Sequence, residues 1–116
     1  MGSCLLIGAV AVTLSGDRFT LETTAAPERH EEWIINAEGL RLLRTRLRGA
    51  GAEDQAGPNA VLHDGWWTWR PNLPPVPELV LSHSAGAPSV WRFCDGGDCR
   101  DLAPAPDKAI TIRPCR

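Results

Sequence analysis

The densest group of side chains that could do chemistry lies within six residues in the first third of the chain. Its members are Glu28, His30, Glu31, Glu32 and Trp33. Carboxylates and an imidazole can bind a hard cation or orient a small polar solute. A charged run is more often a solvated loop, and this spacing matches no established metal-binding motif. We therefore expect a charged loop at residues 27–32 that contacts a ligand or a partner, with no resident metal or cofactor.

Motifs for catalysis give no comparable signal. Asp95, Asp98 and Asp101 surround a Gly-Gly pair but do not fit an EF-hand loop, and Asp is a common turn residue. His83 lies between two serines, but neighbours on a strand point to opposite faces and no G-x-S-x-G motif is present. The chain also contains no phosphate-binding or dinucleotide-binding glycine motif. We expect no catalytic residues and a protein that is not an enzyme.

The chain has four cysteines, an even number that permits two disulfides. They are Cys4, Cys94, Cys99 and Cys115. Three pairings are compatible with the sequence. We favour Cys94 with Cys99, closing the short Asp-Gly-Gly-Asp loop, which leaves Cys4 and Cys115 to join the two ends. A zinc site is the alternative, although one C-x4-C pair with two distant cysteines is not the usual zinc spacing. Disulfides would require an oxidising environment.

Length and composition restrict the class of protein. The chain has 116 residues and a formal net charge of −2, with 12 basic and 14 acidic side chains. This length suits one compact domain over residues 1–116, and the charge balance argues against nucleic acid as a partner. Residues 1–3 resemble a cloning remnant. The apolar run that follows is too short to span a bilayer, so we expect a buried strand there and no transmembrane segment.

Turn signals divide the chain into short strands. Ser15-Gly16-Asp17 predicts a hairpin between the first apolar run and residues 19–24, and Asp64-Gly65 predicts a hairpin between residues 60–63 and 66–70. Residues 71–77 are proline-rich and must run extended as a crossover. A third hairpin is expected between residues 78–84 and 89–94, with a last strand at 110–113.

Residues 40–48 fit two patterns. Leu40, Leu43 and Leu47 have helical spacing, whereas Leu43, Thr45 and Leu47 alternate with arginines as in a half-buried strand. We favour the strand. The predicted fold class is therefore all-β, a single compact antiparallel β-sandwich or partly open barrel of about eight short strands.

Tryptophans and arginines offer two further candidate surfaces. Trp67 and Trp69 would share one strand face, with Trp66 on the other, and either could be a stacking platform. We favour core filling, because the chain has only two Phe and no Tyr. A stripe of basic residues would occupy one face of the strand at 40–48, which we interpret as a solvated face: Arg41, Arg44, Arg46 and Arg48.

Several phrases occur together in a particular order. They are G-D-R-F-T-L, E-E-W, G-A-G-A-E, D-G-W-W-T-W-R-P, L-P-P-V-P-E-L-V-L and W-R-F-C-D-G-G-D-C-R-D-L. In this order the chain resembles a small bacterial family of unknown function that is encoded beside TAXI-type TRAP solute transporters. The resemblance covers nearly all of residues 4–116. It implies association with the transporter's membrane subunit or its soluble receptor, at the periplasmic face, and no catalytic activity.

The chain departs from the family pattern in two segments. Ala25 and Ala26 stand where the resemblance leads us to expect a His-Ser pair, and residues 52–58 replace a Gly-Met-Glu-Pro-Pro segment. The residues that carry over are Thr24, Glu28, Glu31, Glu32 and Trp33. We expect a non-catalytic accessory protein of such a transporter. The alternative is a stand-alone periplasmic module that binds a small ligand or cation around residues 28–33.

Overall fold

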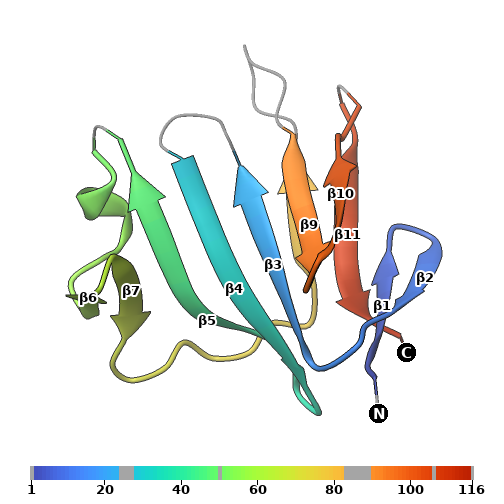
Figure 1. The fold of residues 1–116 in the computed structure, drawn as a ribbon, viewed down its shortest axis with the longest axis horizontal. Helices are drawn as coiled ribbons and strands as arrows, with labels where there is room; N and C mark the ends of the chain where they lie inside the picture. The colour runs from blue at the N-terminus through green and yellow to red at the C-terminus, as the bar shows by residue number, and fades with distance from the viewer. Residues whose placement is uncertain (1, 24–27, 50, 83–89, 106, 116) are drawn as a thin grey trace.

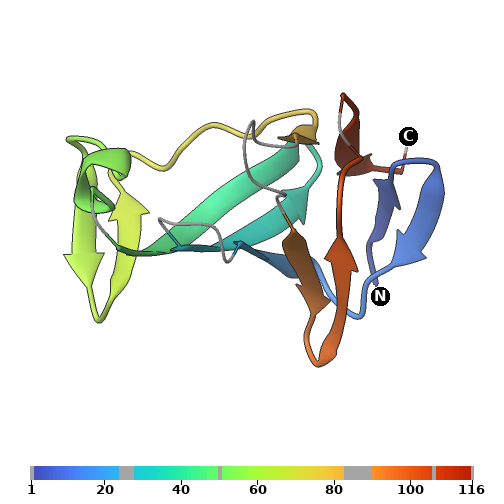
Figure 2. The ribbon, with the colours of Figure 1, turned by 90° about the horizontal axis from the view of Figure 1, so that it is seen from above.

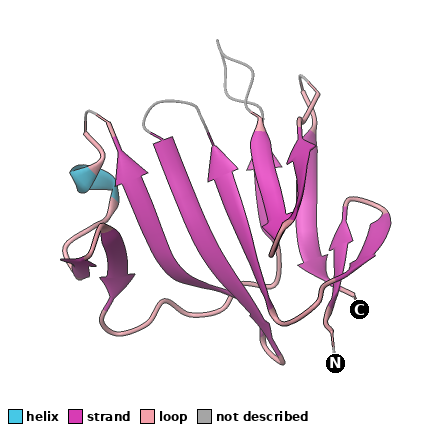
Figure 3. Ribbon diagram, in the orientation of Figure 1, coloured by secondary structure: helices cyan, strands magenta, loops and turns pink. Residues whose placement is uncertain are grey.

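A computed structural model describes residues 2–23, 28–49, 51–82, 90–105 and 107–115. These residues form eleven strands and one short 3₁₀ turn, η1 (Glu53–Gln55), arranged in two antiparallel sheets (Figures 1 and 3). The predicted all-β class is confirmed, and two facing sheets correspond to the sandwich rather than a closed barrel. The strand number exceeds the expected eight. None of the described segments is a helix with the length and apolar character needed to cross a membrane.

The larger sheet has seven strands in the order β10-β9-β3-β4-β5-β7-β6. In that order they are β10 (Asp98–Leu102), β9 (Trp91–Asp95), β3 (Arg18–Thr23), β4 (Glu28–Asn36), β5 (Gly39–Arg48), β7 (Trp66–Trp69) and β6 (Ala60–His63). The strand alternative for residues 40–48 is therefore correct. Its alternation is interrupted once, by a register shift opposite Glu32 and Trp33 that leaves Leu43 as the extra residue.

The smaller sheet has four strands in the order β2-β1-β11-β8. They are β2 (Val10–Thr13), β1 (Cys4–Ile7), β11 (Ala109–Pro114) and β8 (Leu79–Ser82). Pairing of β1 with β11 brings the two ends of the described chain side by side (Figure 1). The expected last strand at 110–113 is confirmed within β11.

The hydrophobic core lies between the four-stranded sheet and the nearer part of the seven-stranded sheet. Period-2 alternation places Leu5, Ile7 and Ile112 on one side and Phe19, Leu21 and Phe93 on the other, and all are buried. The Phe19 and Phe93 rings stack with centroids 5.4 Å apart. Among the described residues, β6 and β7 contribute no side chain to this buried cluster. Part of the larger sheet therefore extends beyond its partner sheet.

The tryptophans do not fill this core as a group. Trp33 is buried, but Trp66, Trp67 and Trp69 are all half-buried on β7. The core-filling expectation was wrong for these three, because β7 lies in the part of the sheet that the smaller sheet does not cover.

Two expected hairpins are replaced by other pairings. The first apolar run is itself a hairpin, because Gly8 has a φ of 62° and lets β1 turn directly into β2. Ser15-Gly16-Asp17 then crosses to the other sheet, where β3 pairs with β4 and β9. Strands β8 and β9 likewise belong to different sheets and do not pair. The segment 83–89 between them, which includes His83, lies outside the described residues.

Two other predictions from turn chemistry are confirmed. Asp64 and Gly65 both have positive φ, 53° and 81°, and join β6 to β7 in a tight hairpin. Residues 71–77 run extended from β7 toward β8 across one side of the large sheet (Figure 2). We call residues 70–77 the strap. Its Val76 exchanges two backbone hydrogen bonds with Leu40 at the start of β5, at 2.7 and 2.8 Å.

Both favoured disulfides are present. Cys4 is bonded to Cys115, 111 positions away, and Cys94 is bonded to Cys99 across the β9–β10 hairpin. The alternative of a zinc site is thereby contradicted, since all four cysteines are used. Disulfides persist in oxidising compartments, with which a periplasmic location is compatible.

Candidate functional site

The five residues singled out from the sequence lie on a strand. Residues 28–32 form the first half of β4, paired on one side with β3 and on the other with β5. The expected loop was wrong, because the charged side chains point from one face of a sheet and do not need a loop to reach water. Alternation then separates the group. Glu28, His30 and Glu32 lie on one face, and Glu31 and Trp33 lie on the other.

The first three belong to what we call the outer face of the seven-stranded sheet, the face turned away from the core. Cross-strand register places charged side chains of both signs on it: Arg18, Glu22, Glu28, Glu32, Arg41, Arg44, Arg46, Arg48, Arg92 and Asp101. The His30 and Trp66 rings lie on the same face. Six arginines against four acidic side chains leave a formal excess of two positive charges, on a chain whose formal net charge is −2. The outer face is thus opposite in sign to the rest of the protein.

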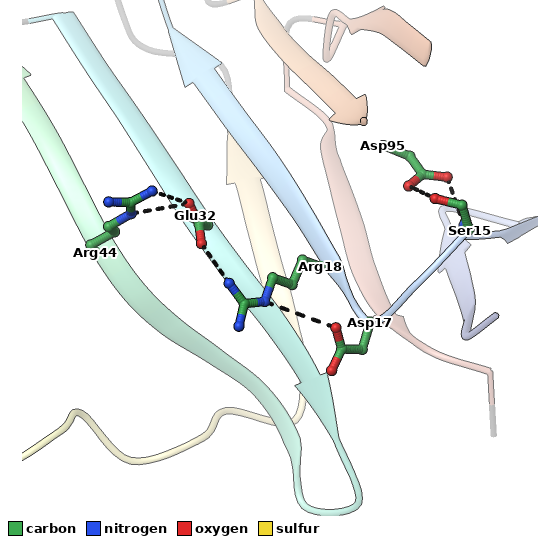
Figure 4. Close-up of polar contacts among 6 residues, drawn as sticks. All are labelled: Ser15, Asp17, Arg18, Glu32, Arg44 and Asp95. Atoms are coloured by element: carbon green, nitrogen blue, oxygen red, sulfur yellow. Dashed lines mark hydrogen bonds and ion pairs between the residues drawn. The ribbon is translucent and has the colours of Figure 1, made fainter. Parts of the chain in front are cut away.

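Ion pairs connect neighbouring strands on the outer face. The Glu32 carboxylate accepts from Arg44 at 3.0 Å and from Arg18 at 3.3 Å, and Arg18 also lies 3.9 Å from Asp17 (Figure 4). Glu28 lies 3.8 Å from Arg48, its direct cross-strand partner. Exposed ion pairs stabilise little, about 0–1 kcal/mol each, so their main effect is to orient the side chains.

Trp66 organises the positive charge at the β7 side of this face. The guanidinium carbons of Arg44 and Arg46 lie 4.1 and 4.4 Å from its ring centroid, and the His30 ring meets it edge-on at 5.3 Å. Beside this group lies a depression of about 350 Å³ whose lining includes Glu28, His30 and Arg46. In the expected arginine stripe, Arg41, Arg44 and Arg46 are half-buried and Arg48 is exposed. The Trp66 ring holds Arg44 and Arg46, and carboxylates pair with Arg44 and Arg48, so these three are not freely solvated.

The other two candidates, Glu31 and Trp33, lie on the opposite face, which we call the inner face. Both are only 8% exposed. The Trp33 indole Nε1 donates to Glu31 Oε1 at 3.2 Å, and Arg29 Nη1 lies 3.6 Å from Glu31 Oε2. Burial raises the pKa of the Glu31 carboxyl above its ordinary value, while the Trp33 hydrogen bond and the Arg29 charge act in the opposite direction.

Glu31 lines a cleft where the large sheet extends beyond the smaller one. The cleft has a volume of about 250 Å³ and is bounded by β4, β5 and β7, by η1 and by the strap. Two hydrogen bonds hold η1 over the sheet: Arg29 Nη2 donates to Gln55 Oε1, and Trp69 Nε1 donates to the Ala56 carbonyl at 2.8 Å. The cleft is thus lined by Arg29 and Glu31 of β4 and by Gln55 and Ala56 at η1.

Sequence reasoning missed most of the cleft. Arg29, Thr45 and Gln55 line it with Glu31 but were not proposed as site residues, and Trp69 was considered only as part of a stacking platform. The alternation of Glu31 and Trp33 with charged neighbours was a usable signal for an inner and an outer face. The contribution of Gln55 was not predictable, because it depends on how an irregular segment folds back over the sheet.

The described residues bring together no set of side chains that could bind a metal cation. Within residues 2–23, 28–49, 51–82, 90–105 and 107–115, no group of three or more His, Cys, Asp or Glu side chains is placed to hold a metal ion. Asp95, one of the three aspartates near the Gly-Gly turn, instead accepts hydrogen bonds from the Ser15 backbone and hydroxyl, both at 2.9 Å (Figure 4). These hydrogen bonds attach residues 15–17, where the chain passes from one sheet to the other, to Asp95 at the end of β9.

Comparisons with known proteins give a partial similarity. No family model matches the chain, and no solved structure matches it. The chain is 38% identical over 63 residues to the bifunctional enzyme IspD/IspF of Brucella abortus, and equally to those of Brucella suis and Brucella melitensis. The match covers 53% of this chain but spans only 16% of each Brucella enzyme. A segment of that size defines neither a family nor an activity for this chain.

Proposed function

We propose that this protein is a non-catalytic accessory component of a TAXI-type TRAP transporter, acting at the periplasmic face. The resemblance described above supports the link to the transporter. The two disulfides are in keeping with an oxidising compartment. The charged outer face of the seven-stranded sheet is the surface through which the protein would contact the membrane subunit or the soluble receptor.

The outer face supports the docking role because its charged side chains are already oriented in the free protein. Arg44 and Arg46 are held against the Trp66 ring, and Arg44 is also hydrogen-bonded to Glu32. Ordering long side chains is one of the main costs of forming an interface, so arginines already in place lower that cost. The excess of positive charge selects a partner surface rich in Asp and Glu.

Co-purification with the transporter tests the docking role. The tagged protein is incubated in mild detergent with the membrane subunit and with the soluble receptor, at low and high salt. We expect saturable binding to one of them that weakens as salt rises. A variant with Arg46→Glu and Arg48→Glu, on the outer face, should lose binding, because both changes place negative charge against an acidic partner.

Arg113→Glu is the matched control, since Arg113 is an exposed arginine on β11 in the other sheet. It should bind like the parent, and circular dichroism should show both variants folded. The proposal would be contradicted if the protein bound neither the membrane subunit nor the soluble receptor, or if the control lost as much binding as the double variant.

Small-ligand binding is a second candidate function. The observation that favours it is the inner-face cleft around Glu31, which a buried carboxylate and a guanidinium line together. The cleft supports a ligand site on the inner face of β4, at Glu31 within the segment 28–33.

A further inference from the structure

The inner-face cleft contains two opposite charges that are only loosely paired with each other. Arg29 Nη1 and Glu31 Oε2 are 3.6 Å apart, longer than the 2.7–2.9 Å of a charge-assisted hydrogen bond. Glu31 uses its other oxygen to accept from Trp33, and Arg29 uses its other amino group to donate to Gln55. One carboxylate oxygen and one amino group therefore face each other across a short gap within the cleft wall.

The rest of the cleft is largely apolar. Leu42 and Leu47 of β5, Leu73 of the strap and the Trp69 ring of β7 line it. Thr45, which is buried, adds a hydroxyl beside Glu31 on the neighbouring strand. A volume of about 250 Å³ is below the usual range for drug-sized ligands, so it suits a molecule of a few carbon atoms beyond its polar group.

These features together select a particular ligand chemistry. A simple cation would gain from Glu31 but be repelled by Arg29, and a simple anion would meet the reverse. A molecule with an ammonium and a carboxylate on the same carbon can satisfy both groups, while its side chain packs against the leucines and the indole. We propose that the cleft binds a free α-amino acid with an apolar side chain, its ammonium on Glu31 and its carboxylate on Arg29.

This inference rests on the ligand-binding candidate function and is independent of transporter docking. The cleft lies on the inner face, whereas the proposed docking arginines lie on the outer face of the same sheet. Failure of one proposal therefore leaves the measurement for the other unchanged.

Calorimetric titration with free leucine tests the inference. Two analogues isolate the charges: isocaproate has the side chain and the carboxylate only, and isoamylamine has the side chain and the amine only. Glycine supplies both charges without the side chain. We expect saturable leucine binding, with each of the three other compounds bound at least about tenfold more weakly, as loss of one charged hydrogen bond or of the apolar contact implies.

Variants locate the binding to this cleft. Glu31→Gln and Arg29→Gln should each weaken leucine binding by about 10–100-fold. The matched controls are Glu28→Gln on β4 and Arg48→Gln on the neighbouring β5, which change the same residue types on the outer face, and they should bind leucine like the parent.

Three results would overturn the inference. They are the absence of leucine binding to the folded parent, equal binding of leucine and isocaproate or isoamylamine, and unchanged binding in the two cleft variants. Because Glu31→Gln and Arg29→Gln remove opposite charges from the same site, misfolding of one variant leaves the other to decide the question.

Discussion

Removal of each disulfide in turn provides a quantitative test of how this fold is stabilised. In the chain-entropy description, a disulfide stabilises by restricting the unfolded chain, and the effect grows with the logarithm of the loop that it closes. Cys4 and Cys115 are 111 positions apart, whereas Cys94 and Cys99 are only 5 apart. The corresponding contributions are about 5 kcal/mol for the long loop and about 2 kcal/mol for the short one. Their difference is thus about 3 kcal/mol.

The perturbation is a pair of double variants, one with Cys4→Ala and Cys115→Ala and one with Cys94→Ala and Cys99→Ala. None of these four side chains is buried, so little packing is lost with either pair. A domain of this size is stable by about 6–17 kcal/mol, which leaves both variants folded or close to it. Urea unfolding should show the terminal variant as the less stable. Thermal unfolding should give it a Tm about 10 °C below that of the hairpin variant.

The denaturant dependence serves as an internal check on the mechanism. Opening the long loop lets the unfolded chain expand, so the m-value of the terminal variant should rise, while that of the hairpin variant stays near the parent value. Equal losses of stability in the two variants, or a larger loss from the hairpin pair, would refute the reasoning from loop length.

Three further predictions concern single positions. Gly39→Ala should lower the free energy of unfolding in urea by about 2 kcal/mol or more, because Gly39 has a φ of 135° and an added Cβ would contact the Val76 carbonyl oxygen. Gly16→Ala is the control and should be nearly neutral, because the space around Gly16 is open. Equal effects of the two substitutions would contradict this prediction. Glu31→Gln should raise the free energy of unfolding at pH 7, because the raised pKa of Glu31 makes its ionised form unfavourable in the folded state. This gain in stability should shrink as the pH falls toward 4.5, the pKa of the carboxyl in the unfolded chain. A gain that grew on acidification would contradict the prediction. Asp95→Ala should cost about 1 kcal/mol of stability and speed amide exchange around Ser15, since it removes both hydrogen bonds that tie this crossing to β9, and unchanged exchange would show that the tie has no effect.

Features encoded by a few neighbouring residues were predictable from the sequence. The Asp64-Gly65 hairpin requires two positive φ values that this dipeptide tolerates, and the Cys94–Cys99 closure follows from a short turn between two cysteines. Pairings between distant segments were not predictable. A turn signal such as Ser15-Gly16-Asp17 shows that the chain reverses or bends, but not whether the flanking strands pair with each other or enter different sheets.

The candidate site was predictable in composition but not in arrangement. The charged run at residues 27–32 favours a loop by sequence alone, because such runs are more often solvated loops and Glu is depleted in strands. Pairing with β3 and β5 overrides that propensity, since Arg44 and Arg48 offer opposite charges directly across from Glu32 and Glu28. The cleft beyond Glu31 arises because the two sheets differ in width, which depends on all strand pairings together.

The bond between Cys4 and Cys115 has a consequence for how this molecule withstands proteases. Residues 4–115 form a single covalent ring, with a small second ring inside it at Cys94 and Cys99. One cut outside the small ring opens the large ring but releases nothing, because the two pieces remain joined at the disulfide. A protein nicked once would therefore keep its mass, plus one water, until it is reduced. Two cuts in the large ring would be needed before any fragment could leave.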